Sequence, residues 1–202
     1  LKKSRQTFGI YSSWLLTLGQ FLTYQKDVKN NGGNAILTSD KHKTGTDRIY
    51  EAYQKLNLDN VDFIMNLQGD EPAINIQDIT NLNQMMIDHK AKIGTLAAKV
   101  EDKLDLTNEN IVKVITENNL EDDPFSKAKI FLRKSKDTSN IYHHIGIYCY
   151  SSQILKNFVE LPQSKNEIEN RLEQLRALDN DIKINVALAS KAPRFIIRGL
   201  HV

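Results

Sequence analysis

The stretch VDFIMNLQGDEP, residues 61–72, decides the fold class of this chain. Residues 61–67 form a nearly continuous apolar run of strand length, which is typical of a buried parallel strand. Gly69 then permits a tight turn, and Pro72 ends the strand. Further short apolar runs alternate along the chain with segments of helical period. The pattern predicts an α/β sheet with crossover helices.

The other expected elements follow from the same two periodicities. Further strands are expected at residues 35–38, 92–100, 111–115, 128–132, 144–150 and 182–189. One helix is expected after the polar loop 39–46, with Ile49, Ala52, Tyr53 and Leu56 as its apolar positions. A second is expected over residues 76–89, with Ile76, Ile79, Leu82, Met86 and Ile87 on its buried side. A third is expected from a capping box at Ser164 and Glu167 to Leu178. Residues 1–30 show no clear strand followed by a glycine-rich turn.

The composition, with 40% hydrophobic and 26% charged residues, is typical of a soluble globular protein. We therefore expect a single domain over residues 1–202. The formal net charge of +2 is too small and too evenly spread to indicate a nucleic-acid surface. The single cysteine, Cys149, excludes an internal disulfide and suits a reducing cytoplasm. An apolar stretch at residues 14–22 is too short and too polar to span a membrane, and no signal-peptide cleavage site follows it.

The end of the deciding stretch is a candidate ligand site. Gln68, Asp70 and Glu71 emerge at the carboxyl end of the expected strand, and this edge of an open α/β sheet is where ligands bind. Two adjacent carboxylates offer the hard oxygen ligands with which Mg²⁺ binds a phosphate-bearing substrate. The alternative is a plain turn with an acidic helix cap, because Asp and Pro are common turn residues.

A second candidate site is KHKTGTDR, residues 41–48. Thr46 is the expected N-cap of the following helix, and Gly45 leaves its backbone open to a ligand. Helix N-termini bind anions through free N–H groups and the helix dipole. Asp47 in the first turn is equally compatible with a simple helix start.

A third candidate is YHHIGIYCY, residues 142–150. By strand alternation His144, Tyr148 and Tyr150 share one face. An imidazole and two phenols could hydrogen-bond a polyhydroxylated sugar, although an ordinary strand with satisfied polar tips gives the same pattern. His143 and His144 do not indicate a metal site, because no third ligand lies at a suitable spacing.

The fourth candidate is ENRLEQLRAL, residues 169–178. Glu173 and Arg176 are spaced as a surface ion pair on a helix. The leucines of this stretch form the buried stripe, and Gln174 is free to point elsewhere.

Taken together and in this order, TGTDR (44–48), NLQGDEP (66–72), HIGIYCY (144–150) and LEQLRAL (172–178) resemble one family, the 3-deoxy-manno-octulosonate (Kdo) cytidylyltransferases. The resemblance covers roughly residues 34–191, and the combination is far more specific than any single motif. It implies an α/β fold of the nucleotide-diphosphosugar-transferase type, Rossmann-like, with a mixed sheet and flanking helices.

The resemblance also implies a reaction, in which CTP and Kdo give CMP-Kdo and pyrophosphate with Mg²⁺, for lipopolysaccharide assembly in the cytoplasm by a homodimer. By motif, Asp70 would bind the magnesium of CTP, and Asp70 and Gln68 are the candidate catalytic residues. Gly45, Thr46 and Arg48 would line the cytidine site. The expected Kdo contacts are Gln68, His144, Tyr148, Glu173 and Gln174. Arg133 stands in the place of a family arginine and is a further candidate substrate contact. No nucleic-acid or membrane partner is implied.

Two departures from the family keep alternatives open. Residues 1–30 lack the family's phosphate-binding loop, and residues 192–202 lack its late metal-binding aspartate, as a truncated or frameshifted gene would produce. Both missing pieces act on the developing phosphate charge, and stabilising that charge usually contributes most to such catalysis. A catalytically inactive remnant is therefore one alternative. A cytidylyltransferase for another sugar acid, such as a sialic acid, is the other, and HIGIYCY with LEQLR favours Kdo over it.

Overall fold

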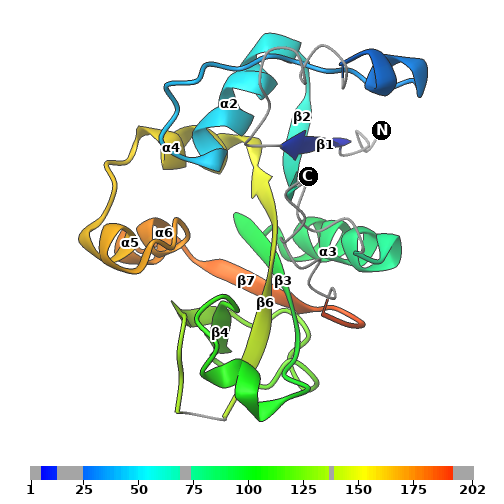
Figure 1. Cartoon of the computed structure of the whole chain (residues 1–202). Coiled ribbons are helices and arrows are strands. Elements are labelled where there is room, and N and C mark those ends of the chain that lie inside the picture. The colour runs from blue at the N-terminus through cyan, green and yellow to red at the C-terminus, as the bar shows by residue number, and fades with distance from the viewer. Residues whose placement is uncertain (1–5, 13–24, 69–73, 137–138, 193–202) are drawn as a thin grey trace, which may run out of the picture.

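Seven strands form one mixed sheet in the computed structural model of this chain, which describes residues 6–12, 25–68, 74–136 and 139–192. The strands are β1 (Gln6–Ser12), β2 (Val61–Gln68), β3 (Ile93–Lys99), β4 (Lys113–Thr116), β5 (Ala128–Leu132), β6 (Ile141–Ser151) and β7 (Ile184–Leu188). The main order is β1-β2-β6-β3-β7, and β4 pairs with both β6 and β5. The β1–β2 and β3–β7 pairs are parallel, whereas β6 runs antiparallel to β2, β3 and β4 (Figure 1).

Helices flank this sheet, which confirms the expected α/β class. They are α2 (Gly45–Leu56), α3 (Ile76–His89), α4 (Ser152–Glu160), α5 (Lys165–Asn170) and α6 (Leu175–Asp179), with a 3₁₀ turn at Lys103–Leu106 and helical backbone at residues 25–30. Over the described part of the chain, no helix combines the length and apolarity that a membrane span requires.

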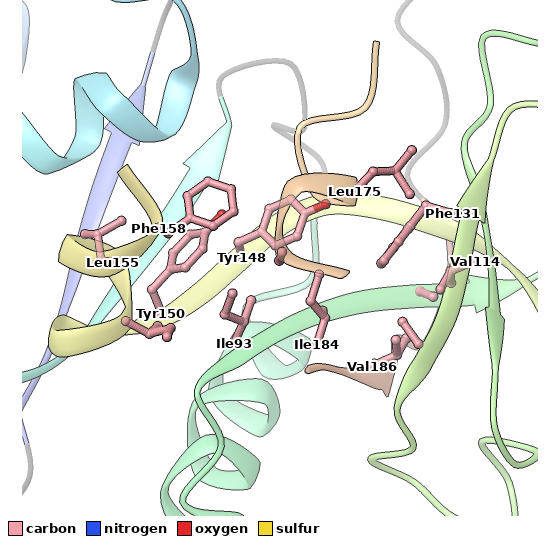
Figure 2. Close-up of a cluster of buried hydrophobic side chains, with 14 of the residues drawn as sticks. Ile93, Val114, Phe131, Tyr148, Tyr150, Leu155, Phe158, Leu175, Ile184 and Val186 are labelled. Carbon is pink, nitrogen blue, oxygen red and sulfur yellow. The ribbon is translucent and has the colours of Figure 1, made fainter. Parts of the chain in front are cut away.

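Strand β6 divides the hydrophobic core into two clusters. Tyr148 and Tyr150 project into one cluster together with side chains of α4 and α6, which Figure 2 shows around Phe158 and Leu175. Ile147 and Cys149 project into the other, which α3 covers. The alternation expected along residues 144–150 is therefore confirmed, and it assigns the polar aromatic groups to the face that carries α2, α4 and α6.

Helix α3 packs closely on β3 because Gly94 has no side chain. A Cβ at this position would lie 2.5 Å from Met86 Sδ and 3.0 Å from Leu82 Cδ1, and both of these side chains are fully buried. We expect Gly94→Ala to lower the free energy of unfolding by about 1–3 kcal/mol through overpacking. Urea denaturation measures this loss. Adding Gly94→Ala to a Met86→Ala variant should cost less than Gly94→Ala alone, and fully additive losses would contradict the packing explanation.

Several expected boundaries are confirmed closely. The helix over residues 76–89 and the strand over 128–132 have the expected bounds, and the strand over 61–67 extends one residue further, to Gln68. Ile76 was wrongly assigned to the buried side of α3, since it is 78% exposed at the first position of the helix, where the chain has not yet turned onto the sheet.

Three other expectations were wrong. Residues 35–38 form no strand, because side chains of α2 bind this segment: Lys55 donates to the Leu37 carbonyl and Arg48 to the Thr38 hydroxyl. Residues 1–30 do contain a strand, β1, which pairs in parallel with β2, while residues 13–24, where a glycine-rich turn would follow it, lie outside the described residues. The helix expected to run from Ser164 to Leu178 is interrupted at Arg171, whose φ of 53° is left-handed. The capping box that opens α5 at Ser164 and Glu167 is confirmed.

Candidate functional site

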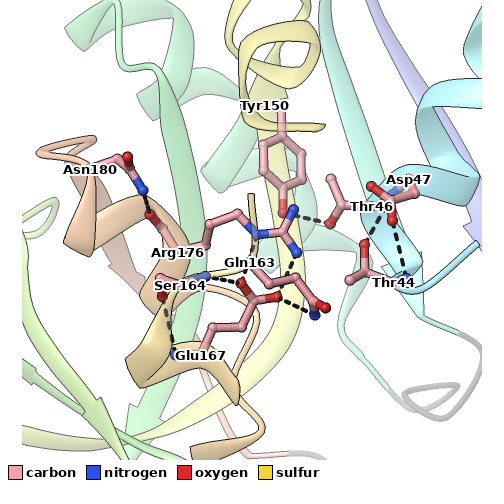
Figure 3. A network of polar contacts seen from close by, with 9 residues as sticks. All are labelled: Thr44, Thr46, Asp47, Tyr150, Gln163, Ser164, Glu167, Arg176 and Asn180. Carbon is pink, nitrogen blue, oxygen red and sulfur yellow. Dashed lines mark hydrogen bonds and ion pairs between the residues drawn. The ribbon is translucent and has the colours of Figure 1, made fainter. Parts of the chain in front are cut away.

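The N-terminus of α2 forms one wall of the candidate site. Thr44, not Thr46, is its N-cap: Thr44 is extended, its hydroxyl accepts from Asp47 N at 3.3 Å, and its own N–H donates to the Asp47 carboxylate at 3.2 Å. This capping box leaves the Thr46 hydroxyl free to face β6, where it lies 3.5 Å from Tyr150 Oη (Figure 3). Thr44 and Thr46 are both buried, so the start of the helix lies inside the molecule rather than on its surface.

A row of aromatic side chains along β6 forms the floor. The ring centroids of His144 and Tyr148 are 5.4 Å apart, and those of Tyr148 and Tyr150 are 5.8 Å apart. Thr95 bonds His144 Nε2 at 3.0 Å and also donates to the Ile147 carbonyl at 2.7 Å. Since a hydroxyl has one proton, the Thr95 oxygen accepts from Nε2–H. Burial lowers the pKa of His144 to about 3, so its imidazole is neutral at physiological pH.

Two buried polar atoms of the candidate site have no hydrogen-bond partner among the described residues: Tyr148 Oη on β6 and Glu173 Oε1 in the segment before α6. Burial raises the pKa of Tyr148 well above its usual value, and the nearby charge of Glu173 adds to this rise. Burial also raises the pKa of Glu173, while the hydroxyls of Thr46 and Thr44 oppose it. Buried polar groups are normally bonded, so an unsatisfied donor beside an unsatisfied acceptor indicates a place for a polar ligand.

The expected surface ion pair between Glu173 and Arg176 was wrong. Arg176 is 2% exposed and makes its ion pair with Glu167 instead. The spacing argument failed because the predicted continuous helix is broken at Arg171, so Glu173 precedes α6 and faces α2 while Arg176 turns inward.

The register of β2 places its carboxyl end beside the same floor. Asn66 pairs with Tyr148 across the sheet, and β2 continues for two residues to Gln68. The Gln68 side chain and all of Asp70 and Glu71 lie outside the described residues, so their predicted roles remain predictions. Elsewhere in the described ranges, no group of three or more His, Cys, Asp or Glu side chains could hold a metal ion.

Known proteins are similar to this chain in sequence and in fold. The sequence model of the family described as "Cytidylyltransferase" matches residues 23–184. The 3-deoxy-manno-octulosonate cytidylyltransferase of Thermodesulfovibrio yellowstonii is 46% identical over 172 residues, which cover 80% of this chain and 68% of that protein. The enzyme of the same name from Parabacteroides distasonis is 40% identical over 174 residues, covering 81% and 69%. The chain belongs to the 3-deoxy-manno-octulosonate cytidylyltransferase family.

A solved structure supports the same assignment. The structure of a CMP:2-keto-3-deoxy-manno-octonic acid synthetase complexed with CTP matches 86% of this chain and 71% of its own, with a TM-score of 0.75 and 29% identity. The fold implied by the motifs is thereby confirmed, and the chain is a nucleotidyltransferase of this family.

The other residues predicted from the family resemblance lie on α2, just before α6 and just after β5. Gly45 is in the buried first turn of α2, and Gln174 immediately precedes α6, half-buried and without a side-chain capping bond. Arg48 projects from α2 towards residue 38. Arg133 donates from Nε, Nη1 and Nη2 to the carbonyls of Asn170, Glu109 and Arg171, each at 3.0 Å. A direct contact between Arg133 and substrate remains a prediction, while its observed bonds support the chain that leads to Glu173.

Sequence reasoning missed two contributors to the site. Thr46 is the N-cap expected from the sequence, although Thr44 lies three residues before Asp47, which is the spacing of a capping box. The Glu167–Arg176 pair was also missed, because nine residues separate its partners and no helical spacing joins them. A buried arginine of this kind has no local signature in the sequence.

Proposed function

We propose that this chain transfers CMP from CTP to Kdo, giving CMP-Kdo and pyrophosphate for lipopolysaccharide biosynthesis. The observation that carries the proposal is the unsatisfied pair Tyr148 Oη and Glu173 Oε1, facing a buried helix N-terminus in a chain of this family. A polyhydroxylated sugar acid supplies both the acceptor that the phenol needs and the hydroxyl donor that the carboxylate needs.

The sugar-acid subsite comprises the floor and the chain before α6. Its contacts are Gln68, His144, Tyr148, Glu173 and Gln174, with Arg133 beyond them. Neutral His144, whose Nε2–H is held by Thr95, presents Nδ1 as an acceptor for a sugar hydroxyl. This fixed tautomer favours a hydroxyl over a carboxylate at that position.

The nucleotide subsite comprises Gly45, Thr46 and Arg48 at the start of α2. Free N–H groups and the positive end of the helix dipole favour an anionic ligand at that point. The anomeric hydroxyl of Kdo attacks the α-phosphorus, the bond to the pyrophosphate oxygen breaks in line, and the hydroxyl proton is lost to solvent or a nearby base. Such transfers need positioning and charge neutralisation more than covalent help.

Magnesium fits the donor chemistry of the segment after β2. Strand β2 ends at Gln68, and Asp70 and Glu71 come soon after it in the sequence; Mg²⁺ takes one or two carboxylates together with phosphate oxygens. We assign Asp70 as the metal ligand. When bound, the ion would neutralise charge on the triphosphate during transfer.

Pyrophosphate release from CTP, Kdo and Mg²⁺ tests the proposal. Turnover that requires all three components supports it. Turnover with a sialic acid in place of Kdo would reassign the sugar acid, and no release above the blank would favour the inactive-remnant alternative.

We also propose a cytoplasmic homodimer, on the family resemblance alone. Light scattering coupled to size-exclusion chromatography tests the assembly: a mass near 46 kDa, twice the 23.1 kDa of one chain, supports a dimer, and a single-chain mass contradicts it.

A further inference from the structure

We infer that the buried Glu167–Arg176 ion pair is a positioning device that fixes residues 171–174, and with them Glu173 and Gln174, for the sugar-acid substrate. The inference rests on the proposed function for the identity of that substrate. Neither side chain is assigned a substrate contact, and both act through the segment between them.

The carboxylate of Glu167 joins two separate helices. Its Oε2 accepts from Arg176 Nε at 2.8 Å and from Ser164 N at 3.1 Å, and its Oε1 accepts from Arg176 Nη2 at 2.5 Å and from Gln163 Nε2 at 3.2 Å (Figure 3). The same group therefore caps α5 and holds the first turn of α6. The guanidinium also lies 4.8 Å from the ring centroid of Phe158, so it is packed as well as paired.

The segment between the two helices has little regular structure of its own. Helix α5 ends at Asn170, Arg171 is left-handed, and α6 has five residues, too few to be stable without tertiary contacts. Arg133 holds the carbonyls of Asn170 and Arg171 from the β5 side. The ion pair closes the segment at its other end, so Glu173 and Gln174 lie between two fixed points.

Glu167, not Glu173, is the ion-pair partner of Arg176. The charge of Arg176 contributes to lowering the pKa of Glu173 against its burial, so the two groups interact electrostatically. Across the described residues, however, the only ion pair of Arg176 is with Glu167. Without the Glu167 carboxylate, the buried guanidinium would be left without its ion-pair partner, and the first turn of α6 would lose its link to α5.

Steady-state kinetics of Glu167→Gln test this inference. We expect the KM for Kdo to rise about tenfold, the lower end of the effect of groups that orient ligand-binding residues. The KM for CTP should stay unchanged, because Glu173 and Gln174 are proposed contacts of the sugar acid and not of the nucleotide. Glu169→Gln is the matched control, since Glu169 lies on the same helix but makes an exposed ion pair with Lys165. It should leave both constants unchanged. An equal rise in both constants for Glu167→Gln would overturn the inference.

A double variant separates positioning from folding. Glu167→Gln alone leaves the charge of Arg176 buried and unpaired, which destabilises the fold, whereas Glu167→Gln with Arg176→Met removes both charges. We expect this protein to recover its thermal stability but to keep the raised KM for Kdo. A KM that returns to the wild-type value would show that the pair serves stability alone and would overturn the inference.

Amide hydrogen exchange supplies a measurement that does not depend on turnover. The N–H groups of Leu175 and Arg176 donate to the carbonyls of Leu172 and Glu173 in the closed segment. Glu167→Gln should speed exchange at Leu175 and Arg176 and leave α2 unchanged, and unchanged exchange there would overturn the inference. A wild-type chain without turnover would instead overturn the proposed function, while this exchange result still decides whether the pair fixes the segment.

Discussion

Asp70→Asn is expected to lower turnover by at least about 10²–10³-fold, to the level of the blank, without lowering the melting temperature. Removing one group that stabilises developing phosphate charge typically has an effect of this size. The amide retains the shape of the side chain but loses the negative charge with which a carboxylate binds Mg²⁺. Pyrophosphate release at saturating CTP and Kdo measures turnover, and a thermal melt without substrates measures folding.

The matched control is Asp62→Asn. Asp62 is exposed near the amino end of β2, whereas Asp70 comes two residues after the last residue of that strand in the sequence. We expect wild-type turnover from Asp62→Asn. For Asp70→Asn, excess Mg²⁺ should restore some turnover only if the variant still binds the metal weakly. Unchanged turnover in Asp70→Asn would remove Asp70 from the metal role.

The elements with long, regular patterns were predicted well from the sequence. The apolar run that becomes β2 and the amphipathic helix α3 each carry enough consecutive residues for one periodicity to dominate. Short segments failed because tertiary contacts outweigh local preference over a few residues. Residues 35–38 are bound by α2 side chains, and β1 is a strand because β2 offers a partner along its whole length. Neither cause is visible within the segment itself.

In the candidate site, too, the sequence predicted what a local pattern decides and failed where tertiary contacts decide. The faces of Tyr148 and Tyr150 follow from strand alternation, and the sequence therefore predicted them. The burial of Arg176 could not be predicted, because it depends on a left-handed Arg171 that ends α5 and on a partner nine residues away. An i,i+3 spacing indicates a surface pair only while the helix continues through both residues.

Tyr148→Phe is expected to change stability and substrate affinity in opposite senses. The hydroxyl of Tyr148 is buried without a partner, so removing it should raise the free energy of unfolding by about 1 kcal/mol, because an unsatisfied buried group destabilises the fold. The same hydroxyl is the proposed donor to the sugar acid. Hydrogen bonds to charged groups contribute about 1.5–3 kcal/mol, so the KM for Kdo should rise roughly 10- to 100-fold. Urea denaturation and initial rates measure the two effects.

Tyr142→Phe provides the matched control on the same strand. Tyr142 is as buried as Tyr148, with 6% against 7% exposed, but its hydroxyl is satisfied: it accepts from Leu120 N at 2.9 Å and donates to Asn119 Oδ1 at 3.2 Å. Removing it leaves a buried N–H unpaired, so Tyr142→Phe should lose about 1–3 kcal/mol of stability while the KM for Kdo stays unchanged. A gain in stability together with a raised KM for Kdo is expected only from a hydroxyl that has no partner in the fold and bonds the ligand. A loss of stability in Tyr148→Phe as well would mean that its hydroxyl already has a partner within the fold, and the sugar-acid subsite would then have to be placed elsewhere.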